Sequence, residues 1–151
     1  MTDYKQLNRQ LEALTQGIPY RIANLANASA LLFDRMEDLN WAGFYLLEDG
    51  KLILGPFQGK TACIEIPVGK GVCGNAVASG ETQRVEDVHQ FPGHIACDCA
   101  SNSELVIPIR SKGEIIGVLD LDSPNLGRFT KEDQEGLEVF VQVLERTVFG
   151  E

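Results

Sequence analysis

The chain has 151 residues, of which 44% are hydrophobic and 23% are charged, and its formal net charge is −9 at neutral pH. This length suits one ordinary domain, whose hydrophobic core is large enough to be stable without disulfide bonds. The acidic balance, without a cluster of Lys or Arg, argues against a nucleic-acid or anionic-membrane surface, because binding there depends on displacing counterions from phosphates. We therefore expect a single domain over residues 1–151 that binds neither nucleic acid nor membrane.

The chain also lacks the signals of export. No apolar run approaches the ~20 residues that span a bilayer, and the N-terminal stretch is polar and helix-like rather than a secretory signal. We expect a cytoplasmic protein. In such a reducing compartment, structural disulfides are not expected among the four cysteines, which are then buried bystanders, metal ligands or redox-active thiols: Cys63, Cys73, Cys97 and Cys99.

The N-terminal half predicts two helices and a hairpin. Apolar residues recur at helical spacing over about 4–17 and again over 19–39. The stretch "WAGFYLLEDGKLILGPF" predicts two strands around the Asp49-Gly50 turn, a dipeptide typical of hairpins. After it, "CIEIPVGKG" predicts a short strand, and "GVCGNAVASG" predicts a short helix that ends at Gly80.

The C-terminal half predicts a strand, a loop, a second hairpin and a helix. A strand at "TQRVEDV" precedes the polar loop "GHIACDCASNSE", and "ELVIPIRSKGEIIGVLDLDS" turns back at Lys112-Gly113. The last helix has Thr130 as its N-cap and Asp133 at the capping-box position. Helices at both ends of paired hairpins predict an α+β fold: a central antiparallel sheet with the N- and C-terminal helices packed on one face.

The cysteine-rich loop allows three interpretations. Cys97 and Cys99 are separated by one residue and follow His94, a spacing that departs from the usual zinc patterns, so we expect no bound metal. Cys97 lies among polar residues, and a loop cannot bury so many polar groups cheaply, so an accessible thiol with thiolate chemistry is an option. A merely exposed cysteine is the plain alternative. Cys63 and Cys73 fit small buried hydrophobic residues.

Three acids and one aromatic residue could form a site near this loop. In "GVLDLDS", Asp120 and Asp122 face one side of the strand and the leucines face the other. Glu104 opens the preceding strand and should lie near the same end of the hairpin. A solvated strand face is the ordinary explanation, but the strand is apolar enough to be central, so its polar face could line a pocket. Trp41 is either a core residue or an aromatic pocket wall.

Several motifs occur together and in order: "NWAGFYLL", "GPFQGKTACIEIPVGKGVCGNAV", "VHQFPGHIACD", "SNSELVIPI" and "GVLDLDSP". On these motifs, which cover most of the chain, the sequence resembles the single-domain GAF-type enzymes that reduce free methionine-(R)-sulfoxide. Fold likeness alone would be a weak argument, because GAF folds serve many functions. The spacing of Cys63, Cys73 and Cys97 is the more specific part of the resemblance.

The resemblance implies a role for each matching residue. Cys97 would be the attacking cysteine and Cys63 the resolving one, with Cys73 a further family cysteine that assists resolution in some members. Cys99 departs from the pattern, because a small residue usually stands there. Substrate-pocket roles are implied for five residues: Trp41, Tyr45, Glu104, Asp120 and Asp122.

This reaction sets further expectations. An attacking thiolate, a proton for the departing oxygen and a resolving thiol are needed, with thioredoxin as external reductant and no bound cofactor. A resolver distant in sequence implies that the cysteine loop moves. The crowded acids, with raised pKa values, would supply the proton and bind the substrate ammonium group, and backbone N–H groups of "GKGVCGN" would receive its carboxylate. A GAF-type sensing module without catalysis is the alternative, and the amphipathic terminal helices are compatible with a homodimer.

Overall fold

The computed structural model describes residues 1–93 and 101–150, and its elements follow the predicted order. The helices are α1 (Tyr4–Thr15), α2 (Arg21–Arg35), α3 (Gly71–Ser79) and α4 (Lys131–Thr147), with one short 3-10 turn, η1 (Val88–Gln90). The strands are β1 (Trp41–Glu48), β2 (Lys51–Gly59), β3 (Glu65–Pro67), β4 (Gln83–Val85), β5 (Ser103–Ser111) and β6 (Glu114–Ser123). Each predicted helix and strand is present, and the α+β prediction is confirmed.

Some predicted bounds were wrong, and the backbone gives the reason. Helix α2 ends at Arg35 instead of near residue 39, because the backbone is already extended at Met36 (φ −102°, ψ 135°), and Asp38 (φ 60°) is left-handed. Strand β4 ends at Val85, since Asp87 caps the η1 turn by accepting a hydrogen bond from the His89 backbone N–H at 3.0 Å. Short-range side-chain capping thus overrode the strand pattern of "TQRVEDV".

The strands form one six-stranded antiparallel sheet in the order β3-β2-β1-β6-β5-β4. Both hairpins turn where the sequence predicted, at residues with positive φ: Asp49, Gly50, Lys112 and Gly113. Strands β1 and β6 pair with each other at the centre, with Trp41 opposite Asp122 and Gly43 opposite Asp120. The acid-bearing strand is therefore central, as its apolar composition predicted.

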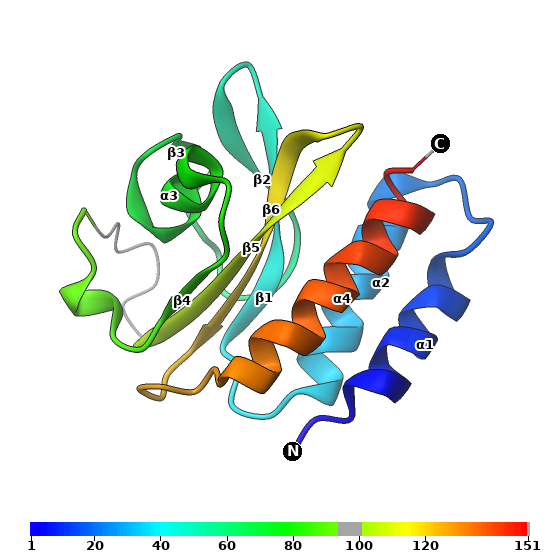
Figure 1. Cartoon of the computed structure of the whole chain (residues 1–151), viewed down its shortest axis with the longest axis horizontal. Coiled ribbons are helices and arrows are strands. Elements are labelled where there is room, and N and C mark those ends of the chain that lie inside the picture. The colour runs from blue at the N-terminus through cyan, green and yellow to red at the C-terminus, as the bar shows by residue number, and fades with distance from the viewer. Residues whose placement is uncertain (94–100, 151) are drawn as a thin grey trace.

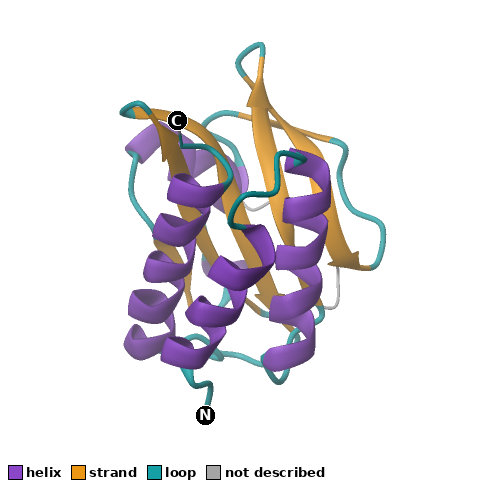
Figure 2. Ribbon diagram, turned by 90° about the vertical axis from the view of Figure 1, so that its right-hand side faces the viewer, coloured by secondary structure: helices purple, strands orange, loops and turns teal. Residues whose placement is uncertain are grey.

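The described helices lie on both faces of the sheet (Figures 1 and 2). Helices α1, α2 and α4 pack together on the first face, while α3 lies on the opposite side. Helix α4 starts with the predicted capping box, in which Thr130 and Asp133 each accept from the other's backbone N–H. Tyr4 of α1 also donates to Asp133 Oδ1 at 2.5 Å, which fastens the first helix to the last.

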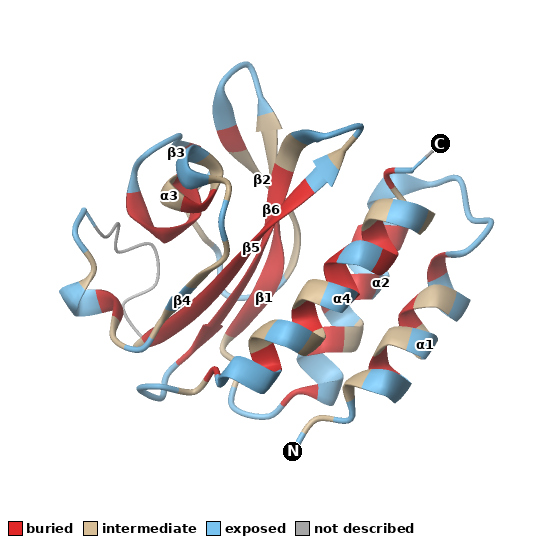
Figure 3. Ribbon diagram, viewed as in Figure 1, coloured by how far each residue is buried: buried red, intermediate tan, exposed pale blue. Residues whose placement is uncertain are grey.

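The burial pattern divides the interior into two clusters, one on each face of the sheet (Figure 3). The larger cluster packs Leu119 and Leu121 of β6 against the three-helix layer. The smaller cluster lies under α3 and includes Trp41, Tyr45 and Cys73. Among the described residues, no helix has the length and apolar character that crossing a membrane demands.

Candidate active site

Three buried carboxyl groups meet at one end of the central hairpin, on the α3 face. Glu104 of β5 lies opposite Asp122 of β6, and Asp120 stands two residues further along the same face. Their exposed fractions are 8% for Glu104, 5% for Asp120 and 8% for Asp122. These acids lie close together, as predicted. Because all three are buried, they do not lie on a solvated strand face.

Helix α3 brings a thiol against these acids. The Cys73 Sγ donates to Glu104 Oε2 at 3.9 Å, and one ligand atom from each of Cys73, Glu104 and Asp120 lies within 4.8 Å of the other two. Gly74 lets α3 pack closely against the end of β3, because a Cβ there would stand 2.5 Å from the Pro67 carbonyl oxygen. Cys73 is buried as its apolar neighbours predicted, but no local pattern indicated that acids surround it.

The electrostatics of the cluster favour retained protons. Burial, then repulsion from Asp120 and Asp122, raises the pKa of Glu104 well above its usual value. Burial also raises the pKa of Asp120 to about 6, although hydrogen bonds with Glu104 and Cys73 oppose the rise. The Cys73 pKa is raised by burial and then by the neighbouring carboxylates. Burial among other carboxyl groups therefore favours the protonated forms of Glu104 and Cys73, whereas the pKa of Asp120 is about 6.

An aromatic stack borders the acids. The Trp41 ring stacks with two others, with its centroid 5.9 Å from that of Tyr45 and 5.1 Å from that of Phe57. Its indole N–H donates to the Lys60 carbonyl at 3.0 Å, which fixes the ring plane. Phe57 was missed by the sequence analysis. The signal was Gly43, its partner in β1, because any side chain at Gly43 would collide with Phe57.

Tyr45 connects the aromatic stack to one of the cysteines. Its hydroxyl donates to the Cys63 carbonyl oxygen at 2.8 Å, and burial, followed by nearby Asp120, raises its pKa. Cys63 is half-buried and disulfide-bonded, so it is not the inert hydrophobic residue that its sequence context allowed. Cys73 is a free thiol, so these two cysteines are not joined to each other.

Residues 94–100 of the cysteine-rich loop lie outside the described residues. Cys97, Cys99 and His94 belong to it, so their predicted roles and the predicted movement of the loop stay predictions. The described part of the site consists of the acids, Cys73, the aromatic stack and Cys63.

The predicted carboxylate receiver is only partly available. In "GKGVCGN", the backbone N–H groups of Gly69, Lys70, Gly71 and Gly74 already donate to carbonyl oxygens. The N–H groups of Val72 and Cys73 remain in the first turn of α3, where a helix has no internal partner for its donors. Any anion at this loop would therefore meet the N-terminus of α3 rather than the glycine backbone.

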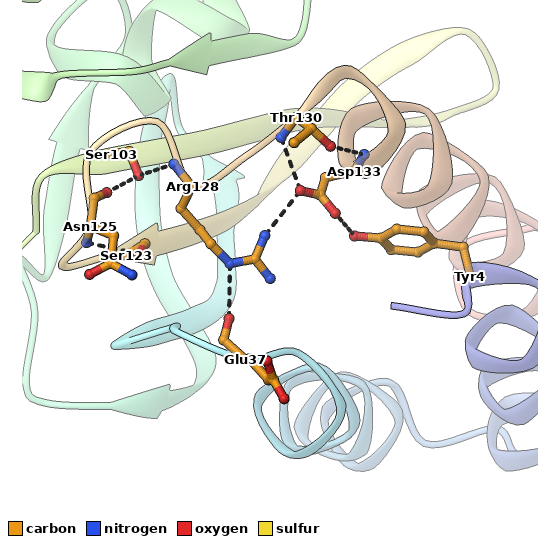
Figure 4. Close-up of polar contacts among 8 residues, drawn as sticks. All are labelled: Tyr4, Glu37, Ser103, Ser123, Asn125, Arg128, Thr130 and Asp133. Carbon is orange, nitrogen blue, oxygen red and sulfur yellow. Dashed lines mark hydrogen bonds and ion pairs between the residues drawn. The ribbon is translucent and has the colours of Figure 1, made fainter. Parts of the chain in front are cut away.

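A polar network holds the strand ends that carry the acids (Figure 4). The Arg128 side chain donates to Asp133 Oδ2 and to the Glu37 carbonyl, each at 3.0 Å. Its backbone N–H donates to Ser103 Oγ at 3.3 Å, and Ser103 Oγ donates to the Asn125 carbonyl at 2.6 Å. Ser103 precedes Glu104 directly, so the network fixes where β5 begins.

The chain is similar to known proteins with a GAF domain and to named reductases. Residues 23–147 match the family model described as GAF domain, in agreement with the sheet and its helical layer. The chain is 61% identical to the free methionine-R-sulfoxide reductase of Escherichia coli (strain K12) over 145 residues, which is 96% of this chain and 88% of the relative. It is 44% identical to the reductase of that name from Saccharomyces cerevisiae, covering 95% of this chain and 84% of the relative.

A solved structure leads to the same group. The Staphylococcus aureus fRMsr in complex with substrate superimposes with a TM-score of 0.94 at 52% identity, covering 98% of this chain and 97% of that one. The chain belongs to the GAF-domain family of free methionine-R-sulfoxide reductases, which are oxidoreductases.

Proposed function

We propose that this chain reduces free methionine-(R)-sulfoxide to methionine. The main support for this proposal is the buried cluster of Glu104, Asp120 and Asp122. The chain is also 61% identical to a reductase named for that substrate. Reduction requires a proton for the sulfoxide oxygen as well as a thiolate for its sulfur. A carboxyl group whose pKa is raised by burial beside other carboxyl groups meets the first requirement.

In the proposed first step, the Cys97 thiolate attacks the sulfoxide sulfur while Glu104 protonates the oxygen. The S–O bond breaks, and oxygen is transferred to Cys97 as a sulfenic acid. The substrate sulfur gains two electrons and leaves as a thioether, and the cysteine sulfur loses two. Glu104 is the donor in this proposal because its pKa is raised well above the usual range, whereas that of Asp120 is about 6.

In the proposed second step, the Cys63 thiol condenses with the sulfenic acid, which releases water and forms a disulfide. Thioredoxin then reduces that disulfide by thiol exchange and leaves both cysteines as thiols. The disulfide-bonded, half-buried state of Cys63 supports its assignment as resolver. Cys73 suits this role less well, because its raised pKa disfavours the thiolate.

The remaining groups would bind the substrate. Asp120 and Asp122 would pair with its ammonium group, and the Trp41 face would hold its methyl group and so select the epimer. The carboxylate would be received by the Val72 and Cys73 N–H groups at the start of α3. A pocket that binds both charged ends of an amino acid excludes a peptide-bound residue, because the peptide bonds would leave its polar groups unpaired.

The direct test supplies racemic free methionine sulfoxide, thioredoxin, thioredoxin reductase and NADPH. Consumption should stop at about half of the sulfoxide, because one epimer is reduced. Binding of the sulfoxide without NADPH oxidation would instead indicate the sensing module without catalysis.

Two cysteine variants then test the division of labour. Cys97→Ser should abolish even a single turnover, whereas Cys63→Ser should release one equivalent of methionine and stall. Equal loss in both variants would contradict the assigned roles.

A further inference from the structure

The cluster at the α3 face contains the donor atoms of a metal site as well as those of an acid catalyst. Cys73 comes from α3, Glu104 from β5 and Asp120 from β6, and all three side chains are buried. A sulfur and two carboxylate oxygens, each within 4.8 Å of the others, form a mixed donor set. Zn²⁺ binds such sets through thiolate and carboxylate ligands, whereas Mg²⁺ and Ca²⁺ select all-oxygen sites.

An independent observation also points to a ligand. Asp120 Oδ1 is buried and accepts no hydrogen bond from any described group, in a residue that is 5% exposed. Its carboxylate is directed into the cluster, because one of its oxygens lies within 4.8 Å of both the Cys73 and the Glu104 ligand atoms. An acceptor left without a partner in the interior is unfavourable, and a cation bound by this carboxylate would remove that cost.

The spacing suits a tetrahedral ion. With Zn–S near 2.3 Å and Zn–O near 2.1 Å, tetrahedral sulfur and oxygen ligands stand about 3.6 Å apart. Cys73 Sγ and Glu104 Oε2 are 3.9 Å apart, so a shift of a few tenths of an ångström brings them to that spacing. The main chain that carries them is fixed by the β5–β6 ladder and by α3, so the ligands start close to the required arrangement.

We infer that Cys73, Glu104 and Asp120 form a binding site for one thiophilic divalent cation of the Zn²⁺ class. On coordination Cys73 loses its thiol proton and Glu104 loses its carboxyl proton, both to solvent, and the two carboxylates complete three ligand positions. The fourth position stays open to water or to Asp122, as in zinc sites with three protein ligands. This site differs from the metal alternative raised by the sequence, which used His94, Cys97 and Cys99.

A functional consequence follows, and it depends on the proposed reduction. A cation held by Glu104 leaves that carboxyl group no proton to donate and occupies the place of the substrate ammonium group. Zn²⁺ should therefore inhibit turnover reversibly, and a chelator should restore it.

The binding test needs no turnover. In a chain carrying Cys63→Ser, Cys97→Ser and Cys99→Ser, Cys73 is the only thiol left. Added Co²⁺ should give a sulfur-to-cobalt charge-transfer band that saturates at one equivalent and disappears when Zn²⁺ displaces it. Further replacement by Cys73→Ser should abolish the band. Absence of the band from the chain whose only thiol is Cys73 would overturn the inference.

Two more variants guard against misfolding and stray sites. Asp120→Asn in the same background should lose the band while circular dichroism shows a retained fold. The pair His89→Ala and His94→Ala removes both histidines and should leave the band unchanged. A band that needs a histidine and survives Asp120→Asn would place the metal elsewhere. Binding at Cys73 without inhibition of turnover would support the metal site and count against Glu104 as the proton donor.

Discussion

The two faces of the central hairpin use the same backbone for opposite purposes. On the helical face, Leu119 and Leu121 are fully buried among apolar side chains of α1, α2 and α4. On the α3 face, Asp120 and Asp122, their neighbours in sequence, are almost as deeply buried among other acids. Burial stabilises the first face and destabilises the second, because burying apolar surface is favourable whereas crowding ionisable groups is costly. The stability of the helical face thus supports an unfavourable arrangement on the other.

The largest expected effect on turnover comes from a substitution on the α3 face, which carries the acids. Glu104→Gln keeps the shape of the side chain but removes the proton that the proposed reaction needs, so turnover should fall by about 10²-fold or more. Single-turnover release of methionine measures this loss at the chemical step. Glu114→Gln, at the exposed start of the same hairpin strand β6, is the matched control and should keep full activity. Full activity in Glu104→Gln would remove this residue from the mechanism.

The next largest effect is a loss of stability from a substitution on the face covered by α1, α2 and α4. Leu119 is fully buried in the large cluster, so Leu119→Ala should lower the free energy of unfolding by about 2–5 kcal/mol through lost burial and a residual cavity. Urea denaturation monitored by circular dichroism measures it. Turnover per folded molecule should stay near that of the unaltered chain, because the leucine faces away from the acids. A loss of activity in step with Glu104→Gln would show that the two faces are not separable.

The buried acid Asp120 should make the free energy of unfolding depend on pH, whereas its leucine neighbours should not. The pKa of Asp120 is about 6 in the folded chain against 3.8 ordinarily, so the folded state holds more protons than the unfolded state between these values. Stability contributed by the protonated carboxyl is therefore full below the unfolded pKa and is lost as pH rises through about 6. Asp120→Asn should thus raise the free energy of unfolding near pH 8, by up to about 3 kcal/mol.

The same variant supplies its own control at low pH. Near pH 4 the carboxyl group of the folded unaltered chain is protonated, so the unaltered chain and Asp120→Asn should differ little in unfolding free energy. Urea denaturation at the two pH values measures both differences. Destabilisation at the higher pH would mean that the charged carboxylate has a stabilising partner that outweighs its burial.

Local patterns were sufficient to predict the face that each residue occupies. Turn residues Asp49 and Gly50 set the first hairpin, and strict alternation placed leucines on one side of β6 and acids on the other. Contacts between distant elements were not predictable in this way. The approach of Cys73 to Glu104 depends on how α3 packs across β5 and β6, and no periodicity reports a packing distance.

The aromatic stack shows a second limit. The position of Phe57 beside Trp41 depends on a register shift between Gly43 and Tyr45, which the hairpin turn alone does not reveal. The availability of the N–H groups in "GKGVCGN" was also overestimated, because four of them already donate to backbone carbonyl oxygens. Residue types therefore predicted the chemistry of the site, while its detailed geometry required the fold.

The smallest effect concerns the surface by which the α3 side of the molecule meets its proposed reductant. Ile64, next to the disulfide-bonded Cys63, is 71% exposed, so a protein that reduces this disulfide would cover it. Burying an isoleucine side chain contributes about 1.5 kcal/mol, so Ile64→Ser should raise the KM for thioredoxin by up to about tenfold. Turnover with a small dithiol should not change, because a small reductant needs no apolar docking surface. Val139→Ser on α4, an exposed position of the helical layer, is the matched control and should leave the KM for thioredoxin unaltered. Equal KM values for thioredoxin in Ile64→Ser and the unaltered chain would mean that the reductant approaches Cys63 from another direction.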